Sequence, residues 1–269
     1  MSQPLAPLVA KLDRADESLH SLDDEMRAIS NGEPSTILTE LDFKTGWHTV
    51  EIVHVEPVPP RPSVLVGESL YHGRSVLEHL VWALVKANDK TPGKDHTFPL
   101  WDKPPCLKGV SDTKDAFIGI TKRKQLAGVP ETAIALIEGL QPYRRPEPAR
   151  SFLSILNNMA RDDRHHAIHS SFVGSRPVTD MQSWFRVPRG VHFTEFQPLL
   201  REGQRVVADT KIARFRLSKH GRYPQVQMEG RLPIFVAFGS DAARMVVVGD
   251  FQQINTQLRG IIEPFAEFL

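Results

Sequence analysis

Residues 151–172, SFLSILNNMARDDRHHAIHSSF, determine how the rest of this chain can fold. Apolar side chains recur on one side of this stretch at helical spacing, at Phe152, Leu156, Met159 and Ala167. At about 100° per residue, Asp163 falls on the same face and His166 borders it. An unpaired charge on a buried face is costly. We therefore predict a helix over 150–172 that closes a buried polar network or a functional site.

A second long helix, predicted over residues 63–88, has apolar side chains on nearly all sides, which is typical of a central, buried helix. His72 and His79 are seven residues apart and therefore point the same way. Arg74 and Glu78 are one helical turn apart. We expect the two long helices to hold a polar cluster between them. It comprises Arg74, Glu78, Arg161, Asp163, His165 and His166, supported by His72 and His79.

The order of the remaining patterns, with helices first and strands later, indicates an α+β fold. We expect a core of long helices against a mainly antiparallel sheet, and a C-terminal helix that returns to the helical core. Residues 1–269 are predicted to form one integrated unit. Its mainly helical part is 1–174, which includes a small hairpin at 35–55, and its strand-rich part is 175–269, which ends in a helix. Shorter predicted elements are helices at 5–30, 113–126, 130–140 and 250–269, and a loop at 89–112 with the apolar anchor Phe98-Pro-Leu-Trp101.

Composition excludes several classes of protein. The 33 basic and 32 acidic residues give a net charge of +1, with no global attraction to nucleic acid or membranes. Cys106 is the only cysteine, which excludes an internal disulfide. The N-terminus lacks the pattern of a secretory signal, and no apolar run approaches the length of about 18 residues that a spanning helix needs. These two absences predict a soluble cytoplasmic protein. The sequence also lacks a Gly-rich phosphate loop, which disfavours a nucleotide-dependent kinase, ATPase or dehydrogenase, and we expect no cofactor.

Residues 161–166, Arg-Asp-Asp-Arg-His-His, match the order Arg, then Asn, Asp or His, then any three residues, then His. This order resembles the catalytic motif of the HEPN superfamily, helical proteins that include metal-independent bacterial endoribonucleases of toxin and defence systems. The resemblance implies that Arg161 holds the scissile phosphate, that His166 serves the 2′-hydroxyl or leaving oxygen, and that Asp162 orients them. A guanidinium suits phosphate oxygens, and an imidazole titrates near neutral pH. The resemblance also implies RNA as a partner and a site completed in a homodimer.

A second resemblance covers both long helices. LYHGRSVLEHLVW at 70–82 and NNMARDDRHH at 157–166 are similar to helices of uncharacterised bacterial proteins, common in actinobacteria, which carry LHNLRSALDHL and DKHR. In that register Asp163, Arg164 and His165 take the Asp-Lys-His positions, and Arg74 and Glu78 take the Arg and Asp of the first motif. Asp163 and His165 then join the candidate catalytic residues, and the functional histidine is His165 instead of His166. The two registers remain alternatives.

Three functions follow from these patterns. The first is a HEPN-like endoribonuclease, which requires Arg161 and His166 to share a cleft that solvent reaches. The second is a non-catalytic ligand-binding or sensor module with a buried ionic network, in which Asp163 and His165 are buried against Arg74 and Arg161 points into solvent. The third is a His-rich metal-binding helical protein that resembles DinB-like bundles. Its metal would be held by His165 and His169 at one-turn spacing, completed by His72 or His79.

Overall fold

The elements of this chain form two compact units whose segments alternate along the sequence. The computed structural model describes residues 3–166, 168–174, 185–187, 189–218, 226–228, 234–239 and 245–269. A helical unit comprises Met1–Asp23, Ser63–Ile168 and Val248–Leu269, and a sheet unit comprises Asp24–Pro62 and His169–Val247. The fold is α+β, which confirms the predicted class. That the two units act as one integrated protein stays a prediction.

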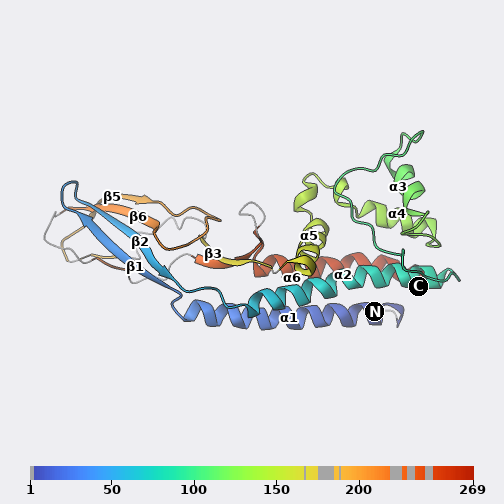
Figure 1. Ribbon diagram of the computed structural model, residues 1–269, viewed down its shortest axis with the longest axis horizontal. Coiled ribbons are helices and arrows are strands. Elements are labelled where there is room, and N and C mark those ends of the chain that lie inside the picture. Colours follow the sequence, from blue (N-terminus) through green and yellow to red (C-terminus); the bar gives the residue numbers. More distant parts are fainter. Residues whose placement is uncertain are drawn as a thin grey trace. The chain divides into compact units, whose positions relative to one another are not determined.

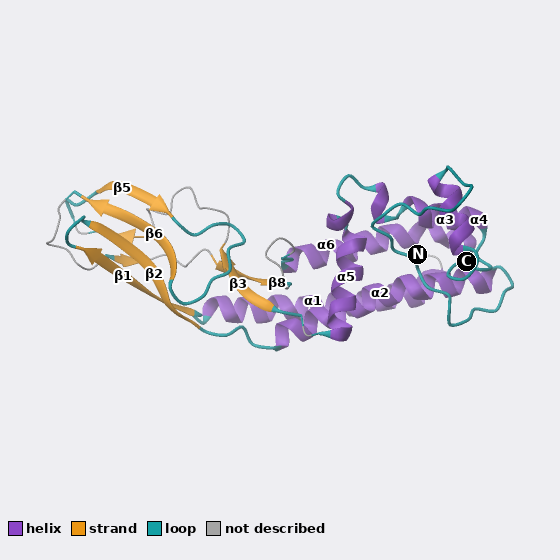
Figure 2. Ribbon diagram, turned by 45° about the horizontal axis from the view of Figure 1, so that its top comes forward, coloured by secondary structure: helices purple, strands orange, loops and turns teal. Residues whose placement is uncertain are grey.

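Three long helices run side by side in the helical unit (Figures 1 and 2): α1 (Ala6–Asn31), which belongs to this unit as far as Asp23, α2 (Arg61–Ala87), which belongs to it from Ser63, and α6 (Val248–Ile262). An ion pair of 2.5 Å between Arg259 of α6 and Asp16 of α1 links two of them. The last helix belongs to the helical unit as predicted, although it begins two residues before Asp250. None of the described helices combines the length and the apolar character that a membrane crossing requires. On α1 the buried side chains recur at three and four, at Leu8, Leu12, Ala15, Leu19 and Leu22.

Helix α5 (Phe152–His165) packs on α2 where α2 has glycines. A Cβ atom at Gly73 would lie 3.3 Å from a methyl carbon of Leu156 on α5. At Gly67 it would lie 2.6 Å from a carboxylate oxygen of Asp163, closer than van der Waals contact allows. The two glycines therefore leave room on α2 for the side chains of Leu156 and Asp163, which a larger residue at either position would force to move.

The predicted helix over 150–172 is too long. Helix α5 ends at His165, and His166 has an extended backbone with φ −147° and ψ 151°. Strand β3 (Ser170–Gly174) follows and pairs antiparallel with β8 (Ile234–Phe238). Backbone hydrogen bonds to a distant strand outweigh the local helical pattern here. Ala167, which the prediction placed on the apolar face of the helix, lies outside the described residues.

The sheet unit is built on the predicted hairpin, β1 (Ser35–Asp42) and β2 (Trp47–Val55), which the structure confirms. The hairpin extends into a four-stranded antiparallel sheet with β6 (Thr210–Leu217) and β5 (Phe193–Pro198), in the order β1-β2-β6-β5 (Figure 2). The hairpin therefore lies in the same unit as the later strands, although the prediction placed it in the helical part. A further short pair joins β4 (Phe185–Arg186) to β7 (Gln227–Met228).

Two short helices complete the helical unit, α3 (Thr113–Thr121) and α4 (Glu131–Gly139). Helix α3 begins where predicted, with Asp112 accepting a hydrogen bond from the Asp115 N–H at 3.0 Å, but it ends five residues before 126. Single 3-10 turns, η2 (Pro142–Arg144) and η3 (Pro148–Arg150), lead from α4 to α5. Two more 3-10 segments, η1 (Gln3–Leu5) and η6 (Glu263–Phe268), lie near the ends of the chain.

Candidate functional site

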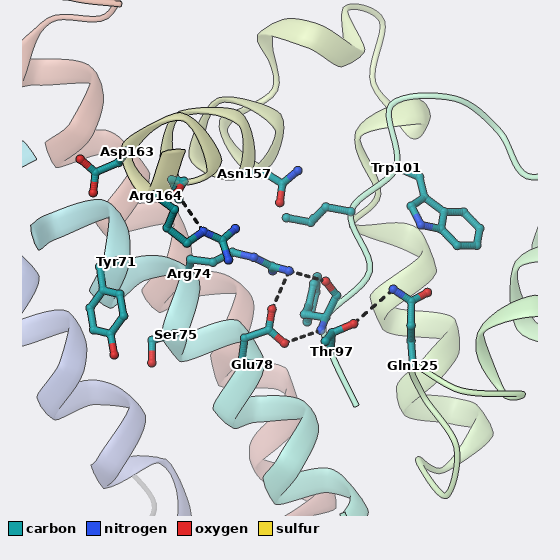
Figure 3. A pocket seen from close by; sticks show the side chains of 13 residues that line it. Tyr71, Arg74, Ser75, Glu78, Thr97, Trp101, Gln125, Asn157, Asp163 and Arg164 are labelled. Carbon is teal, nitrogen blue, oxygen red and sulfur yellow. Dashed lines mark hydrogen bonds and ion pairs between the residues drawn. The ribbon is translucent and has the colours of Figure 1, made fainter. Parts of the chain in front are cut away.

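A cavity of about 440 Å³ opens in the helical unit between α2, α5 and the segment 97–101 (Figure 3). Spacings of three and four residues turn one side of each helix toward it. Helix α2 contributes Tyr71, Arg74, Ser75 and Glu78, helix α5 contributes Asn157, Ala160, Asp163 and Arg164, and the connecting segments contribute Thr97, Phe98, Leu100, Trp101 and Gln125.

Arg74 and Glu78 form an ion pair in the wall of the cavity, with 2.6 Å between Nη2 and Oε1. Their side chains are 17% and 28% exposed. Arg74 also donates to the Phe98 carbonyl at 2.9 Å, and the Phe98 N–H donates to Glu78 at 2.9 Å. Burial lowers the pKa of the Arg74 guanidinium and raises the pKa of the Glu78 carboxyl, and each partner's charge opposes the other's shift. The pair therefore clamps the backbone of Phe98 on both sides.

The segment 97–101 forms a fixed wall because buried polar groups hold its backbone. The Gln141 side chain, which is fully buried, donates to the Pro99 carbonyl at 2.9 Å and accepts from the Trp101 N–H at 3.0 Å. The Gln125 side chain donates to the Thr97 hydroxyl at 3.2 Å. Sequence reasoning identified Phe98 to Trp101 as an apolar anchor but missed both glutamines, since no local pattern distinguishes them from loop residues.

Arg164 is an exposed residue whose guanidinium faces the open side of the cavity, beside Arg74 (Figure 3). Its Nε donates to the Ala160 carbonyl at 3.2 Å. Among the described residues, no carboxylate lies within ion-pair distance of it. Burial lowers the pKa of Arg74, and the positive charge of Arg164 adds a smaller decrease. Burial raises the pKa of Glu78, and the charge of Arg164 opposes that rise, with a smaller effect than Arg74 and the Phe98 N–H. In the described part of the chain, Nη1 of Arg74 is buried without a hydrogen-bond partner. Two guanidiniums therefore lie near one carboxylate, that of Glu78, which forms an ion pair with Arg74 only.

Asp163 lines the cavity, but its carboxylate lies against Gly67 of α2. Figure 3 shows it turned away from the guanidiniums of Arg74 and Arg164. Burial raises the pKa of this carboxyl. The sequence placed Arg74, Glu78 and Asp163 in one cluster, and the structure brings all three to one cavity without a direct Arg74–Asp163 ion pair among the described contacts.

The other members of the predicted cluster lie elsewhere on α5. Arg161 and Asp162 have side chains 60% and 55% exposed and lie 3.8 Å apart, between Nε and Oδ1. His165 and His166 are exposed. None of these four residues is among the side chains that line the cavity. The catalytic roles that the two resemblances imply for them stay predictions.

The histidines do not form the metal site that their spacing suggested. Helix α5 ends at His165, so His165 and His169 do not share a helix face. Across the described residues, no group of three or more His, Cys, Asp or Glu side chains is placed to hold a metal ion. Burial, with a smaller effect of the Lys11 charge, lowers the pKa values of His72 and His79. Neither histidine lines the cavity.

Helical spacing in the sequence was enough to find three more residues of the cavity wall once Arg74 was chosen. Tyr71, Ser75 and Glu78 share one face of α2 with Arg74, at spacings of three and four. That face carries the neighbouring polar side chains of Arg74, Ser75 and Glu78. Comparisons of the chain with protein-family models, with curated proteins and with solved structures find no match.

Proposed function

We propose that this protein is a non-catalytic module that binds or senses a small molecule in the cavity between α2, α5 and the segment 97–101. The observation that carries the proposal is the Arg74–Glu78 pair, which lines the cavity and holds its wall at Phe98. A volume of about 440 Å³ falls within the range of roughly 300–1,000 Å³ that is usual for ligand sites.

The chemistry of the lining supports binding. Aromatic and aliphatic side chains, Phe98, Leu100 and Trp101, provide apolar contact area, and a few polar groups converge between them. Among the described residues that line the cavity there is no histidine or cysteine, the side chains that most often transfer protons or attack substrates near neutral pH. The lining therefore favours recognition over catalysis.

The endoribonuclease hypothesis requires Arg161 and His166 to face a common cleft. Both are exposed, and the cavity is lined by neither. An RNA partner and a homodimer depend on that hypothesis and stay predictions with it. Incubating mixed RNA with the protein in EDTA tests it directly. We expect no cleavage; cleavage by the wild type that an Arg161→Ala/His166→Ala variant loses would overturn the binding proposal.

Binding itself is tested by filling the cavity. Asn157→Trp adds a large side chain at a lining position of α5, and Arg161→Trp adds the same side chain at an exposed position outside the lining. Both variants are checked for wild-type circular dichroism and then screened with a diverse set of small molecules by thermal shift. A ligand at about 100 times its Kd stabilises by roughly 2.7 kcal/mol, which raises Tm by about 5 °C or more.

We expect such ligands to stabilise the wild type and Arg161→Trp but not Asn157→Trp. The proposal is overturned if every stabilising compound acts equally on all three proteins, or if no compound stabilises the wild type.

A further inference from the structure

We infer that the cavity binds a small monoanion, a carboxylate carried on a ring or a short apolar chain, and that Arg164 is its principal anion-binding residue. This inference rests on the proposed function, because it names the class of ligand for the same cavity.

The balance of charge around the cavity points to an anion. Glu78 lies 2.6 Å from Arg74 and compensates its charge. The carboxylate of Asp163 lies against Gly67 and is turned away from both guanidiniums (Figure 3). Arg164 is thus the guanidinium in the lining that forms no ion pair with a described carboxylate, although the charge of Glu78 acts on it from a longer distance. Two adjacent positive charges with one counter-charge repel each other, and an anion between them removes that repulsion.

The free donors match a carboxylate. Nε of Arg164 is engaged by the Ala160 carbonyl, which anchors the side chain and leaves the two terminal nitrogens of the guanidinium available. Two parallel N–H groups of a guanidinium bind both oxygens of a carboxylate in a planar arrangement. Nη1 of Arg74, buried and without a described partner, supplies a further donor beside them.

The acidic groups of the lining select for a single negative charge. Glu78 is part of the same wall, and burial already disfavours its charged form, which raises its pKa. A phosphate monoester, with a charge near −2 at neutral pH, would face one uncompensated guanidinium and a neighbouring carboxylate. A carboxylate brings one charge, and Phe98, Leu100 and Trp101 provide an apolar wall for the group attached to it.

The test removes the negative charge of the ligand and the positive charge of the protein separately. A panel of matched pairs, each an aryl or short alkyl carboxylate and its primary amide, is titrated by calorimetry near pH 7.5 at low salt. Phenyl and benzyl phosphates form a third arm. The proteins are the wild type, Arg164→Gln and Arg161→Gln. Both variants remove one positive charge from α5, but only Arg164 lines the cavity.

We expect at least one carboxylate to bind the wild type and Arg161→Gln roughly tenfold or more tightly than its amide, since hydrogen bonds to charged groups are the stronger kind. Arg164→Gln should weaken that carboxylate by a similar factor and leave the amide unchanged. The inference is overturned if no acid binds better than its amide, if the phosphates bind more tightly than the carboxylates, or if Arg164→Gln behaves like Arg161→Gln.

The two proposals fail in different ways. Amides that bind as tightly as acids, and whose binding Asn157→Trp abolishes, would refute the anion preference and leave the cavity as a binding site. Binding that Asn157→Trp does not affect would refute the proposed function as well.

Discussion

Replacing Glu78 with alanine tests whether the Arg74–Glu78 pair holds the cavity together. The carboxylate is the ion-pair partner of Arg74 at 2.6 Å and accepts from the Phe98 N–H at 2.9 Å. Its removal leaves a guanidinium that is 17% exposed without its counter-charge. Breaking a buried ion pair costs about 3–5 kcal/mol, and water that reaches the 28% exposed site reduces that cost. We therefore expect Glu78→Ala to lower the free energy of unfolding by about 2–4 kcal/mol.

The assay is equilibrium unfolding in urea, followed by circular dichroism. A matched control is Glu17→Ala, which removes a carboxylate 2.7 Å from Arg14 in a pair whose side chains are 57% and 64% exposed. Its effect should be much smaller, because an exposed pair is screened by water. A second control, Arg74→Met/Glu78→Leu, removes both charges together and should cost less than the two single changes added. If Glu78→Ala and Glu17→Ala are equally stable, the clamp on Phe98 does not contribute as argued.

Three further predictions concern the same region. Burial raises the pKa of Glu78 in the folded protein above its ordinary 4.5, so the folded state binds more protons than the unfolded state at this residue. The free energy of unfolding of the wild type, relative to that of Glu78→Gln, should therefore fall as the pH rises from 4.5 through the folded pKa. Urea titrations from about pH 4 to 7 that give a constant difference between the two proteins would contradict this. Gly67→Ala gains up to about 1 kcal/mol of helix propensity but forces the Asp163 carboxylate to move. In an Asp163→Ala background, the effect of Gly67→Ala on the free energy of unfolding should therefore be more favourable by about 1 kcal/mol or more. A double-mutant cycle that shows no coupling between the two positions would mean that Asp163 does not contact Gly67 closely. Gln141→Ala leaves the Trp101 N–H and the Pro99 carbonyl without their hydrogen-bond partner. We therefore expect the free energy of unfolding to fall by about 2–4 kcal/mol and the Trp101 amide to exchange its hydrogen faster. An unchanged exchange rate would mean that other contacts hold the segment 97–101.

Local chemistry was enough to predict the individual elements where the signal is short-range. The turn at 44–46 joins the predicted hairpin, and Gly46 has the positive φ of 71° that such a turn favours. The long helix predicted at 63–88 is α2, Arg61–Ala87, because an apolar pattern over many turns leaves little ambiguity. The same periodicity placed Asp163 on the inner side of α5, where it meets Gly67.

The polar cluster could be predicted only in part. Arg74, Glu78 and Asp163 line one cavity, whereas Arg161 and His166 are exposed. A motif read along the chain combines residues that a helix distributes over different faces, so adjacency in sequence does not imply a shared site.

The sequence by itself determined the α+β class, the hairpin, the long helix α2 and the start of α5, because turn residues and helical periodicity act over a few residues. Only the tertiary structure decided where α5 ends, since the stretch 170–174 is a strand by virtue of its hydrogen bonds to β8. It also decided that a loop at 97–101 forms a wall of the cavity, through buried contacts to Gln141 and the Arg74–Glu78 pair. Such contacts join residues far apart in the chain, and their free energy depends on burial that no local pattern records.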